Sequence, residues 1–444
     1  MEVALTVLAA IGTTLSILKI YQAVLAVIGV FKTKKFKSTK IKKYYGICIA
    51  ARNEEKVIRN LLESIYAQDY PQERLQIFVV ADNCTDNTAA IVRELILSGH
   101  DNTTLYEHNN PNERTKGFAL KYLFEQIKKD FGIECFAGYF IFDADNVLNK
   151  NYITKMNDAF VTDGKAKIFT SFRNSKNTSR NWISFQYAIH WMGTCLAENR
   201  AKSLMPLACR VQGTGILFTN ELVREGWNYT SLTEDRFFGS DAVVKNYRIS
   251  YCDEAEFFDE QPTNLKIAWR QRLRWSKGHL NSTAVNCPKL IRNMFRFDDS
   301  FFKSYDCFWL NFPTHIESLC RRLISLVLNI IIAAMAANLY GWFIGALATF
   351  GLNVAKFWLG GMAKAAFVVT YYRKRLSTPP RFFKTLFNVF MFPVFNLFSR
   401  WTMYVALFSH VEWKPIPHDS LMNLDGGDRP QELLVDNKNK KGKK

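Results

Sequence analysis

Two acidic motifs follow apolar segments that are typical of buried β-strands. Asp143-Ala144-Asp145 follows the segment 139–142, and Asp82 follows the segment 76–81. In open α/β sheets, ligands bind beyond the carboxyl ends of the strands. Two carboxylates two positions apart at such an end can share Mg²⁺ or Mn²⁺, with substrate phosphate oxygens as further ligands. A turn or a helix cap is the alternative for the same D-x-D sequence.

A third acidic motif, Thr233-Glu234-Asp235, lies between two short apolar segments at 215–219 and 248–252. Thr233 could cap a helix whose first turn contains both acids, because hydroxyl and carboxylate side chains are favoured at helix N-termini. A capped turn also holds a carboxylate rigidly, so this structural interpretation is compatible with catalysis. Asp235 is our candidate for a general base that removes a proton from a hydroxyl group.

An amide, two guanidinium groups and an indole come together at Gln271, Arg272, Arg274 and Trp275. In a helix, Gln271, Arg274 and Trp275 lie at i, i+3 and i+4 and share one face. Arg274 can form paired hydrogen bonds with phosphate oxygens, and Trp275 offers a flat surface to a sugar ring. This face suits a diphosphate beside a sugar. The alternative is a basic helix that rests on lipid headgroups, which would suit Arg270 and Arg272.

A scaffold that brings these residues together is predicted between residue 44 and about residue 285. Short strand-like segments alternate there with segments of helical periodicity, a pattern typical of an α/β domain with a mostly parallel sheet. We expect helices at 54–68 and 86–97. We expect strands at 45–50, 75–81, 139–142, 215–219 and 248–252.

Apolar segments flank this domain on both sides. The segment from Val3 to Phe31 is long enough to span a bilayer, and the Lys-rich stretch that follows it favours a cytoplasmic location for the domain. Lys19 within it faces a partner helix or a polar path, or it snorkels to the interface. We expect further spans at 323–339 and 341–369, an interfacial or re-entrant pair at 382–411, and a cytoplasmic C-terminus because of the basic residues 437–444.

These segments divide the chain into parts with different environments. The protein is therefore expected to be an integral protein of the cell membrane, with its catalytic domain in the cytoplasm. The expected parts are an N-terminal transmembrane helix with a basic flank (1–35), a cytoplasmic α/β domain (36–288), interfacial helices (289–320), a transmembrane or re-entrant region (321–412) and a polar basic cytoplasmic tail (413–444).

The composition narrows the partners. The 444 residues carry a net charge of +18, which suits nucleic acid, an anionic lipid leaflet or a phosphate-bearing substrate. Much of this charge flanks apolar segments, and no RNA-binding motif is present, so we expect no nucleic-acid partner. The nine cysteines include no C-x-x-C pair, which argues against a zinc site or a disulfide framework.

The motifs, taken in order, resemble those of the membrane-integrated family 2 glycosyltransferases, which include the cellulose, chitin, hyaluronan and poly-N-acetylglucosamine synthases. The resemblance covers about residues 30–290. It is carried by ICIAARNEE (47–55), VVADNCTDNT (79–88), RTKGFAL (114–120), FDAD (142–145), GTG (213–215), TED (233–235) and QRLRW (271–275).

The resemblance implies a GT-A fold and an inverting hexosyltransferase that uses a UDP-sugar and Mg²⁺ or Mn²⁺. It implies that Asp235, with Glu234 beside it, is catalytic. The metal would be held by Asp143 and Asp145. The implied substrate-binding residues are Glu54 and Asp82 at the uridine, Lys116 at the nucleotide, Asp143 at the diphosphate, Gly213, Thr214 and Gly215 at the acceptor site, and Gln271, Arg274 and Trp275 at the diphosphate and the acceptor terminus.

Two functions remain open at this stage. The first is a processive synthase that extends a β-linked polysaccharide and secretes it through its own membrane helices. The second is a transferase that adds one sugar to a lipid-linked or glycolipid acceptor. The expected partners are the UDP-sugar, a glycan or glycolipid acceptor and membrane lipids, and a narrow conduit of three or four spans could require a homo-oligomer. The TED motif differs from the GDD typical of hyaluronan synthases, which argues against that product.

Overall fold

The computed structural model describes residues 2–296, 300–313, 339–378, 381–425 and 429–433, together with the single residues 316, 318 and 327. Most of the span expected at 323–339 lies outside the described residues. The basic segment 437–444, from which a cytoplasmic C-terminus is expected, also lies outside them.

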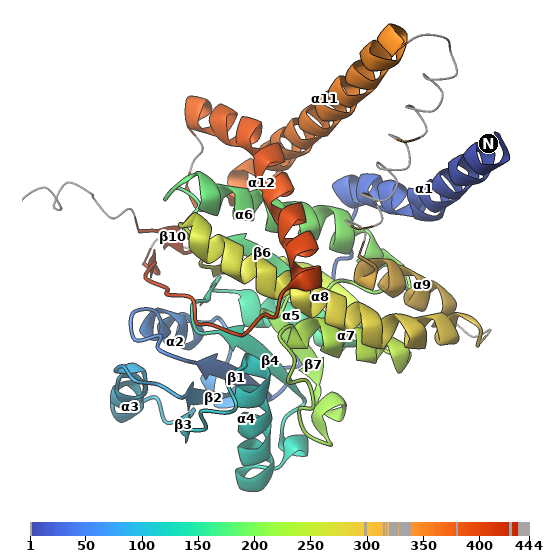
Figure 1. Cartoon of the computed structure of the whole chain (residues 1–444). Coiled ribbons are helices and arrows are strands. Elements are labelled where there is room, and N and C mark those ends of the chain that lie inside the picture. The colour runs from blue at the N-terminus through green and yellow to red at the C-terminus, as the bar shows by residue number, and fades with distance from the viewer. Residues whose placement is uncertain are drawn as a thin grey trace, which may run out of the picture.

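A sheet of eight strands forms the centre of the molecule, in the order β3-β2-β1-β4-β7-β6-β8-β5 (Figure 1). Strands β3, β2, β1 and β4 are parallel to one another, β7 runs antiparallel to β4 and β6, and β8 is parallel to β6. The strands are β1 (Tyr45–Ala51), β2 (Leu75–Asp82), β3 (Thr103–His108), β4 (Gly138–Asp143), β5 (Val147–Leu148), β6 (Ala166–Ser175), β7 (Ile216–Thr219) and β8 (Arg248–Asp259).

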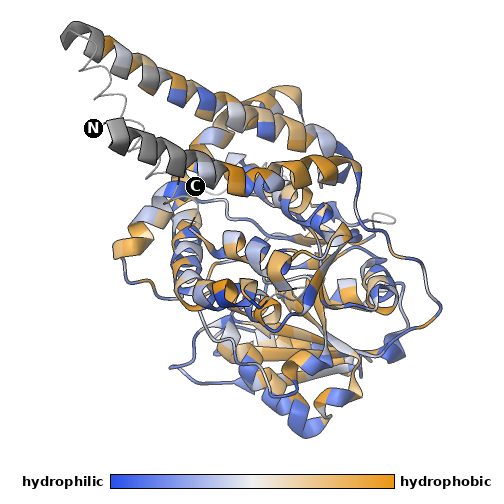
Figure 2. Cartoon of the chain, turned by 90° about the vertical axis from the view of Figure 1, so that its right-hand side faces the viewer, coloured by the Kyte–Doolittle hydropathy of each residue, from blue (hydrophilic) through white to orange (hydrophobic). Residues whose placement is uncertain are grey.

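Helices cover both faces of this sheet, so that its strands are buried and apolar (Figure 2). Alternate residues of β1 pack into different cores: Cys48 lies in the core with α4, whereas Ile47 and Ile49 lie in the core with α2. The helices and short turns of the domain are α2 (Ile58–Tyr66), α3 (Thr88–Leu97), α4 (Lys116–Asp130), α5 (Tyr152–Asp163), α7 (Glu234–Val244), η1 (Gln72–Arg74), η2 (Ile133–Cys135), η3 (Cys195–Arg200), η4 (Lys202–Leu204) and η5 (Asn220–Val223).

Longer helices gather on one side of the domain. In Figure 1, α1 and α11 extend away from it, while α6, α8 and α9 lie across its upper side and α12 runs down onto α8. Hydrogen bonds join α12 to α6 and to α8, from Gln186 to the carbonyl of Asn388 at 2.8 Å and between Ser276 and Thr402 at 3.1 Å. These elements are α1 (Glu2–Phe31), α6 (Trp182–Thr194), α8 (Leu265–Met294), α9 (Ser300–Asn311), α11 (Leu339–Tyr371), η6 (Arg373–Arg375) and α12 (Phe382–Phe408).

Two helices in the described part of the chain, Phe343–Tyr371 and Phe382–Phe408, are long and apolar enough to cross a membrane. The interfacial or re-entrant pair expected at 382–411 is wrong as a description of the backbone, because α12 is one continuous helix with Pro393 inside it. Proline removes one hydrogen bond and bends a helix without ending it when neighbours support both halves. Gly361 of α11 allows this support, because a Cβ there would lie 2.9 Å from the Pro393 ring.

The C-terminal half of α1 is held against the rest of the molecule by polar contacts. The ammonium of Lys19 lies 4.6 Å from the centre of the Trp309 ring on α9. Tyr21 donates to Asp306 at 3.0 Å, and Asp306 also pairs with Lys202 at 2.8 Å in a fully buried position. Of the alternatives for Lys19, the structure therefore shows the contact with a partner helix, α9.

Candidate active site

A cavity of about 240 Å³ lies at the carboxyl ends of β1, β2 and β4, and is closed on its other side by α6, α8 and residues 413–418. Most of the residues singled out in the sequence line it, although they come from distant segments. These are Glu54, Asp82, Lys116, Asp143, Asp145, Gly213, Glu234, Asp235, Gln271, Arg274 and Trp275.

The two remaining candidates lie behind this wall. The hydroxyl of Thr214 is buried, accepts a hydrogen bond from the backbone N–H of Asp143 at 2.9 Å and donates to Asn146. Gly215 has φ of 63°, and a Cβ there would collide with the ring of Phe257. The glycine is therefore required by the turn and by the close ring, and both residues support the acidic edge of β4 from behind.

Asp82 is buried at the end of β2, and its carboxylate has three side-chain partners, one of which is the Asn83 amide at 2.8 Å. Its carboxylate pairs with Arg52, whose Nε also donates to the Asp82 carbonyl at 2.9 Å, and with the His108 ring at 2.9 Å. The Arg52 guanidinium also lies 4.6 Å from the ring centre of Trp413. Asp82, Arg52 and Trp413 thus form a layered wall on the sheet side of the cavity.

Asp143 and Asp145 differ in environment although they are two residues apart. Asp143 is open to the cavity, with 37% of its side chain exposed, and pairs with the ammonium of Lys116. Asp145 is buried and accepts from the backbone N–H of Glu260 at 2.8 Å. Burial raises the pKa of Asp145, but the charges of His418 and Lys176 outweigh this effect, so that its pKa is lowered and the carboxylate stays ionised.

The described residues contain no group of three or more His, Cys, Asp or Glu side chains arranged to hold a metal ion. Asp143 and Asp145 offer hard oxygen donors two residues apart at the cavity wall. This donor set fits Mg²⁺ or Mn²⁺, which commonly takes its remaining ligands from water and substrate phosphates. The residues therefore fit a metal that is completed by a diphosphate.

Glu234 and Asp235 begin α7, as the sequence predicted, but Thr233 forms no capping hydrogen bond through its buried hydroxyl. Asp235 faces the cavity beside Gly213, where a Cβ would lie 3.4 Å from its carboxylate oxygen. Glu234 is more buried and lies 3.8 Å from the Lys116 ammonium. Burial raises the pKa of Glu234 to about 7, with Lys116 opposing the rise and Asp235 adding to it.

Helix α8 presents Gln271, Arg274 and Trp275 to the cavity, as their spacing predicted. Burial lowers the pKa of the Arg274 guanidinium, and the nearby carboxylates of Glu234 and Asp143 oppose that change. The close approach of α8 to the start of α7 requires Gly278, because a Cβ there would collide with Thr233. Arg274 is thereby held among the acids while remaining a cation.

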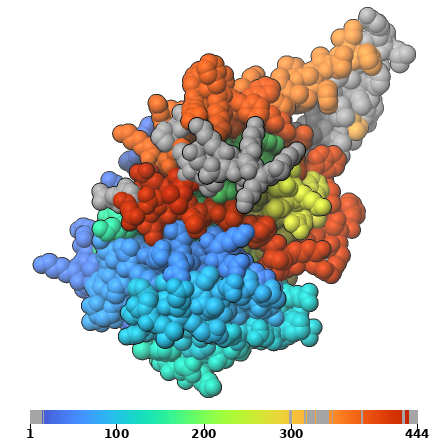
Figure 3. Space-filling view, turned by 90° about the vertical axis from the view of Figure 1, so that its left-hand side faces the viewer, coloured from blue at the N-terminus to red at the C-terminus, as the bar shows by residue number. Residues whose placement is uncertain are grey.

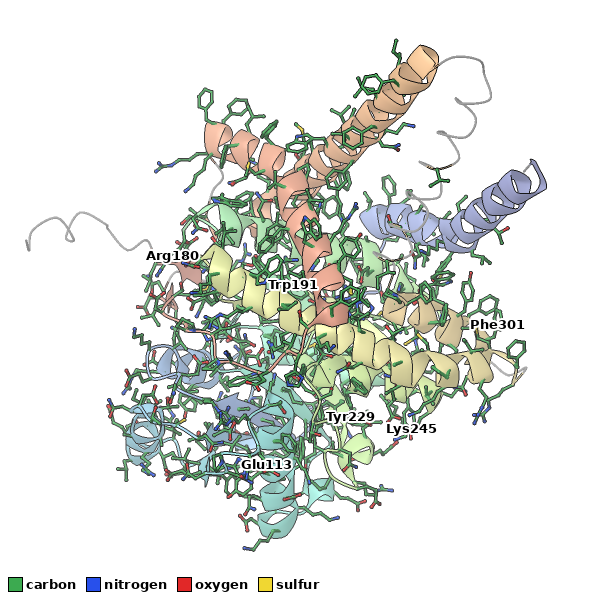
Figure 4. All side chains as sticks on the ribbon, viewed as in Figure 1. Glu113, Arg180, Trp191, Tyr229, Lys245 and Phe301 are labelled. Carbon is green, nitrogen blue, oxygen red and sulfur yellow. The ribbon has the colours of Figure 1, made fainter. Side chains whose placement is uncertain are left out.

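An aromatic wall continues from Trp275 onto α6. The ring centre of Trp191 lies 5.6 Å from that of Trp275, edge to face, and 3.8 Å from the guanidinium of Arg173. Arg173 in turn forms a buried ion pair with Asp259 at the end of β8. Figure 4 labels Trp191 near the middle of the molecule. The sequence did not identify Trp191, Arg173 and Asp259 as part of the site.

Sequence reasoning also did not predict that residues after 412 line the cavity. After α12 the chain crosses the domain to the short strands β9 (Met422–Asn423) and β10 (Gln431–Glu432), and its red atoms lie directly on the N-terminal blue part in Figure 3. His418 contacts both carboxylate oxygens of Glu54 at 3.0 Å. Burial lowers the pKa of His418, but Asp145 and Glu54 outweigh it and raise the pKa to about 10.

The crossing segment is fastened at both ends of its path. The backbone N–H groups of Asp419 and Ser420 donate to the Glu260 carboxylate at 2.9 to 3.1 Å. Farther along, Glu432 accepts hydrogen bonds from the backbone and hydroxyl of Ser179, at 3.2 and 2.5 Å, and from the Thr378 hydroxyl. The sequence indicated only a polar basic tail for residues 413–444, and the residue types at Trp413 and Lys414 do not indicate which surface they contact.

Residues 43–278 match the family described as "Glycosyltransferase like family 2". The probable glycosyltransferase YdaM of Bacillus subtilis is 27% identical over 242 residues, which cover 53% of this chain and 54% of YdaM. The poly-beta-1,6-N-acetyl-D-glucosamine synthase of Staphylococcus aureus is 26% identical over 232 residues, covering 52% of this chain and 53% of the synthase. The chain thus spans about half the length of the curated relatives it matches.

A solved structure of similar architecture is the mannosyltransferase PcManGT from Pyrobaculum calidifontis in complex with GDP-Man and Mn²⁺. Its TM-score is 0.54 at 17% sequence identity, and the match covers 88% of this chain and 99% of that chain. Likeness at this identity shows the fold alone. Together with the order of the strands and the family match, it confirms the expected GT-A-type α/β fold.

Proposed function

The chain belongs to glycosyltransferase-like family 2, and we propose that it is an inverting hexosyltransferase that uses a UDP-sugar at the cytoplasmic face of the cell membrane. The observation that carries this proposal is the meeting of Asp235, Asp143 and Arg274 at one cavity, although they lie on three separate segments. A base, an acidic strand end and a guanidinium are the groups that transfer of a sugar from a diphosphate needs.

In the proposed reaction, Asp235 takes the proton from an acceptor hydroxyl. The hydroxyl oxygen attacks the anomeric carbon, whose bond to the diphosphate oxygen breaks as UDP leaves with the electron pair. Lys116 and Arg274 bind the developing charge on the diphosphate, because both cations are held close to Asp143. When bound at Asp143 and Asp145, Mg²⁺ or Mn²⁺ would neutralise further charge on the leaving group.

The nucleotide would lie on the sheet side of the cavity, between the end of β2 and the crossing C-terminal segment. Glu54 and Asp82 are the proposed uridine contacts, and both are oriented by partners, His418 and Arg52 respectively. Glu234 is proposed to support catalysis by orienting Lys116 rather than by accepting the acceptor's proton, because it is the more buried of the two acids.

We propose that the acceptor is a growing β-linked polysaccharide that passes into the membrane region. Trp275 supplies a stacking surface for a sugar ring, and Trp191 supports it edge to face. The helices that carry them, α6 and α8, pack directly against the apolar helix α12. Large side chains of α11 such as Phe343, Leu347 and Phe350 are more than half exposed, which suits a helix in lipid. Transfer of one sugar to a lipid-linked acceptor would use the same residues.

The test is transfer by the full chain in nanodiscs with Mn²⁺ and a panel of radiolabelled UDP-sugars, with products separated by size. UDP-N-acetylglucosamine comes first, because a relative is named as a poly-beta-1,6-N-acetyl-D-glucosamine synthase. A high-molecular-weight polymer supports processive synthesis, whereas one added sugar that requires lipid acceptor supports single transfer. No transfer from any UDP-sugar would contradict both.

The same assay tests the metal. EDTA is expected to stop transfer, and Mn²⁺ or Mg²⁺ in excess is expected to restore it, because two carboxylates and a diphosphate otherwise repel one another at Asp143 and Asp145. EGTA with free Mg²⁺ serves as the control for effects of the chelator itself. Full activity after exhaustive chelation would remove the proposed metal from the reaction.

A further inference from the structure

Asp82, the proposed uridine contact, ends β2 directly beside His108, the last residue of β3. The two residues are partners in the parallel ladder, and the backbone N–H of Asn83 donates to the His108 carbonyl at 2.7 Å. Asp82 lines the large cavity, whereas His108 is only 7% exposed and does not line it. His108 can therefore act on a bound nucleotide only through a neighbour, and Asp82 is the neighbour at the cavity wall.

The His108 ring is held at both nitrogens and on its face. Nδ1 lies 2.9 Å from Asp82 Oδ1, and Nε2 lies 3.2 Å from a carboxylate oxygen of Glu113, which is labelled in Figure 4. The ring also stacks on Tyr122, with ring centres 4.5 Å apart. Because an ionised carboxylate only accepts hydrogen bonds, the contact with Asp82 requires a proton on Nδ1. The surroundings of the ring thus fix the direction of this donor.

The donors around the Asp82 carboxylate occupy most of its acceptor positions. The two oxygens of a carboxylate accept about four hydrogen bonds in all. Oδ1 accepts from the His108 ring and from the Asn83 amide at 2.8 Å, and Oδ2 accepts from the Arg52 guanidinium. With these donors from the described part of the chain in place, about one acceptor position remains, and it is on Oδ2.

A carboxylate with one free position distinguishes bases by the N–H groups that they present. Uracil presents a single N–H, at N3. Guanine presents two neighbouring N–H groups, at N1 and N2, which a carboxylate binds best with both oxygens free. Cytosine presents an acceptor at N3, which the carboxylate repels. A site with one position matches uracil, because the other two bases leave a polar group unpaired or opposed.

A purely structural role for His108 is the alternative, because a buried ring at the end of an edge strand stabilises the sheet whatever binds nearby. The charge of Asp82 does not require the ring, since Arg52 already pairs with this carboxylate and is itself held by the carbonyls of Asp82 at 2.9 Å and Arg114 at 2.8 Å. What His108 adds is the occupation of Oδ1 and a fixed orientation of the carboxylate.

We infer that His108 is a positioning residue that sets the base selectivity of the donor site. By occupying Oδ1 it leaves Asp82 one acceptor position, which favours uracil over guanine and cytosine. The inference rests on the proposed function, since it assumes that Asp82 contacts the base of the nucleotide.

The first test is nucleotide binding by His108→Phe, which keeps an aromatic ring against Tyr122 but cannot donate to Asp82. Calorimetric titration of the full chain in nanodiscs with UDP, GDP and CDP gives the three dissociation constants. The Kd for UDP is expected to rise about tenfold, because a hydrogen bond to a charged group is lost, with smaller changes for GDP and CDP. The preference for UDP should therefore fall by the same factor. An equal loss of affinity for all three nucleotides would indicate a structural role and overturn the inference.

Two further variants test whether donation to Asp82 is responsible. His108→Asn places an amide N–H near the position of Nδ1 and is expected to restore most of the preference for UDP. His100→Phe is the matched control, because His100 precedes the same strand and stacks on Tyr66 with ring centres 3.6 Å apart. This control should keep the wild-type preference. If His108→Asn behaved like His108→Phe, a hydrogen bond to Asp82 would not explain the selectivity.

Steady-state kinetics separate positioning from catalysis. In His108→Phe the KM for the UDP-sugar should rise about tenfold while kcat stays within about twofold of wild type, because His108 touches no reacting group. A lower kcat at saturating donor with an unchanged KM would overturn the role in base selectivity. A wild-type chain that bound no UDP, or transferred no sugar from any UDP-sugar, would instead contradict the proposed function. Failure of the inference alone leaves wild-type binding and transfer intact, so the two failures are distinguishable.

Discussion

The two sides of the large cavity are built in different ways. On the sheet side, Asp82 and Asp143 end β2 and β4, the two strands that flank β1, and the register is set by the ladder, with Ala50 of β1 opposite Val80 on one side and Asp143 on the other. On the helix side, Trp191 and Trp275 meet edge to face, and the wall is completed by a segment that arrives after α12.

This difference in construction predicts that the two sides contribute differently to turnover and to substrate affinity. Backbone hydrogen bonds between the strands fix the positions of the acids at the sheet edge. Reacting groups require such fixed positions. Aromatic and cation–π contacts contribute about 0.5–2 kcal/mol each and can be changed singly without loss of the fold. We therefore expect substitution of Asp143 at the sheet edge to affect turnover, and substitution of the aromatic residues in the helix wall or the crossing segment to affect substrate affinity.

The largest effect is expected at Asp235, which lies where the two sides meet. Asp235→Asn keeps the shape but cannot accept a proton, so kcat should fall by about 10²–10⁴-fold while UDP affinity stays near wild type. Transfer at saturating UDP-sugar and calorimetric titration with UDP measure the two quantities. Asp241→Asn is the matched control, because Asp241 lies on the same helix but outside the cavity, bonded to Tyr229 at 2.6 Å. Wild-type turnover in Asp235→Asn would assign the base elsewhere.

The sheet side could be predicted from sequence because local patterns determine it. Continuous apolar runs located β1, β2 and β4, and Asp82 and Asp143 are the last residues of β2 and β4. Strand β8 was predicted only to residue 252 but continues to Asp259. The polar residues that obscured it are paired in the fold: Asp253 with Arg200 at 2.5 Å, and Glu256 with Arg429 at 2.7 Å. The pattern of residues within β8 does not predict ion pairs with residues so distant in the sequence.

The helix side and the crossing segment could be predicted only in part. The face of Gln271, Arg274 and Trp275 follows from helical spacing alone, and the structure presents that face to the cavity. The contact of His418 with Glu54 joins positions 364 residues apart, and nothing near His418 in the sequence indicates this partner. Such contacts arise from packing of the whole chain, which short-range patterns do not contain.

A smaller effect is expected in the crossing segment. Trp413→Ala removes the ring from the outer face of Arg52, a contact of the kind that contributes about 0.5–2 kcal/mol. The KM for the UDP-sugar should therefore rise about 2–30-fold, with a smaller change in kcat. Trp413→Phe restores an aromatic face and should recover most of the affinity. If the alanine variant instead lost turnover at saturating donor, the crossing segment would take part in the chemical step. Turnover and substrate affinity would then not divide between the two sides of the cavity.

The smallest effect on turnover is expected at Arg272, on the opposite face of α8 from Arg274. The sequence left open that Arg270 and Arg272 both rest on lipid headgroups, but Arg272 is buried, with its guanidinium 4.1 Å from the Phe395 ring and 4.5 Å from the Tyr187 ring. Its Nε and Nη2 have no hydrogen-bond partner. Arg272→Met therefore removes two stacking contacts and also removes two costly unpaired donors.

These opposing terms decide the sign of the stability change. Stacking on two rings and the hydrogen bond to Ser399 outweigh the unpaired donors, so Arg272→Met should lower the thermal midpoint by about 2–4 °C, with turnover within about twofold of wild type. Arg270→Met, at an exposed position of the same helix, should shift neither quantity. A raised midpoint in Arg272→Met would mean that desolvation dominates at this site, as it does for many buried charges. The packing of α8 against α6 and α12 would then be stabilised by its aromatic contacts and not by Arg272.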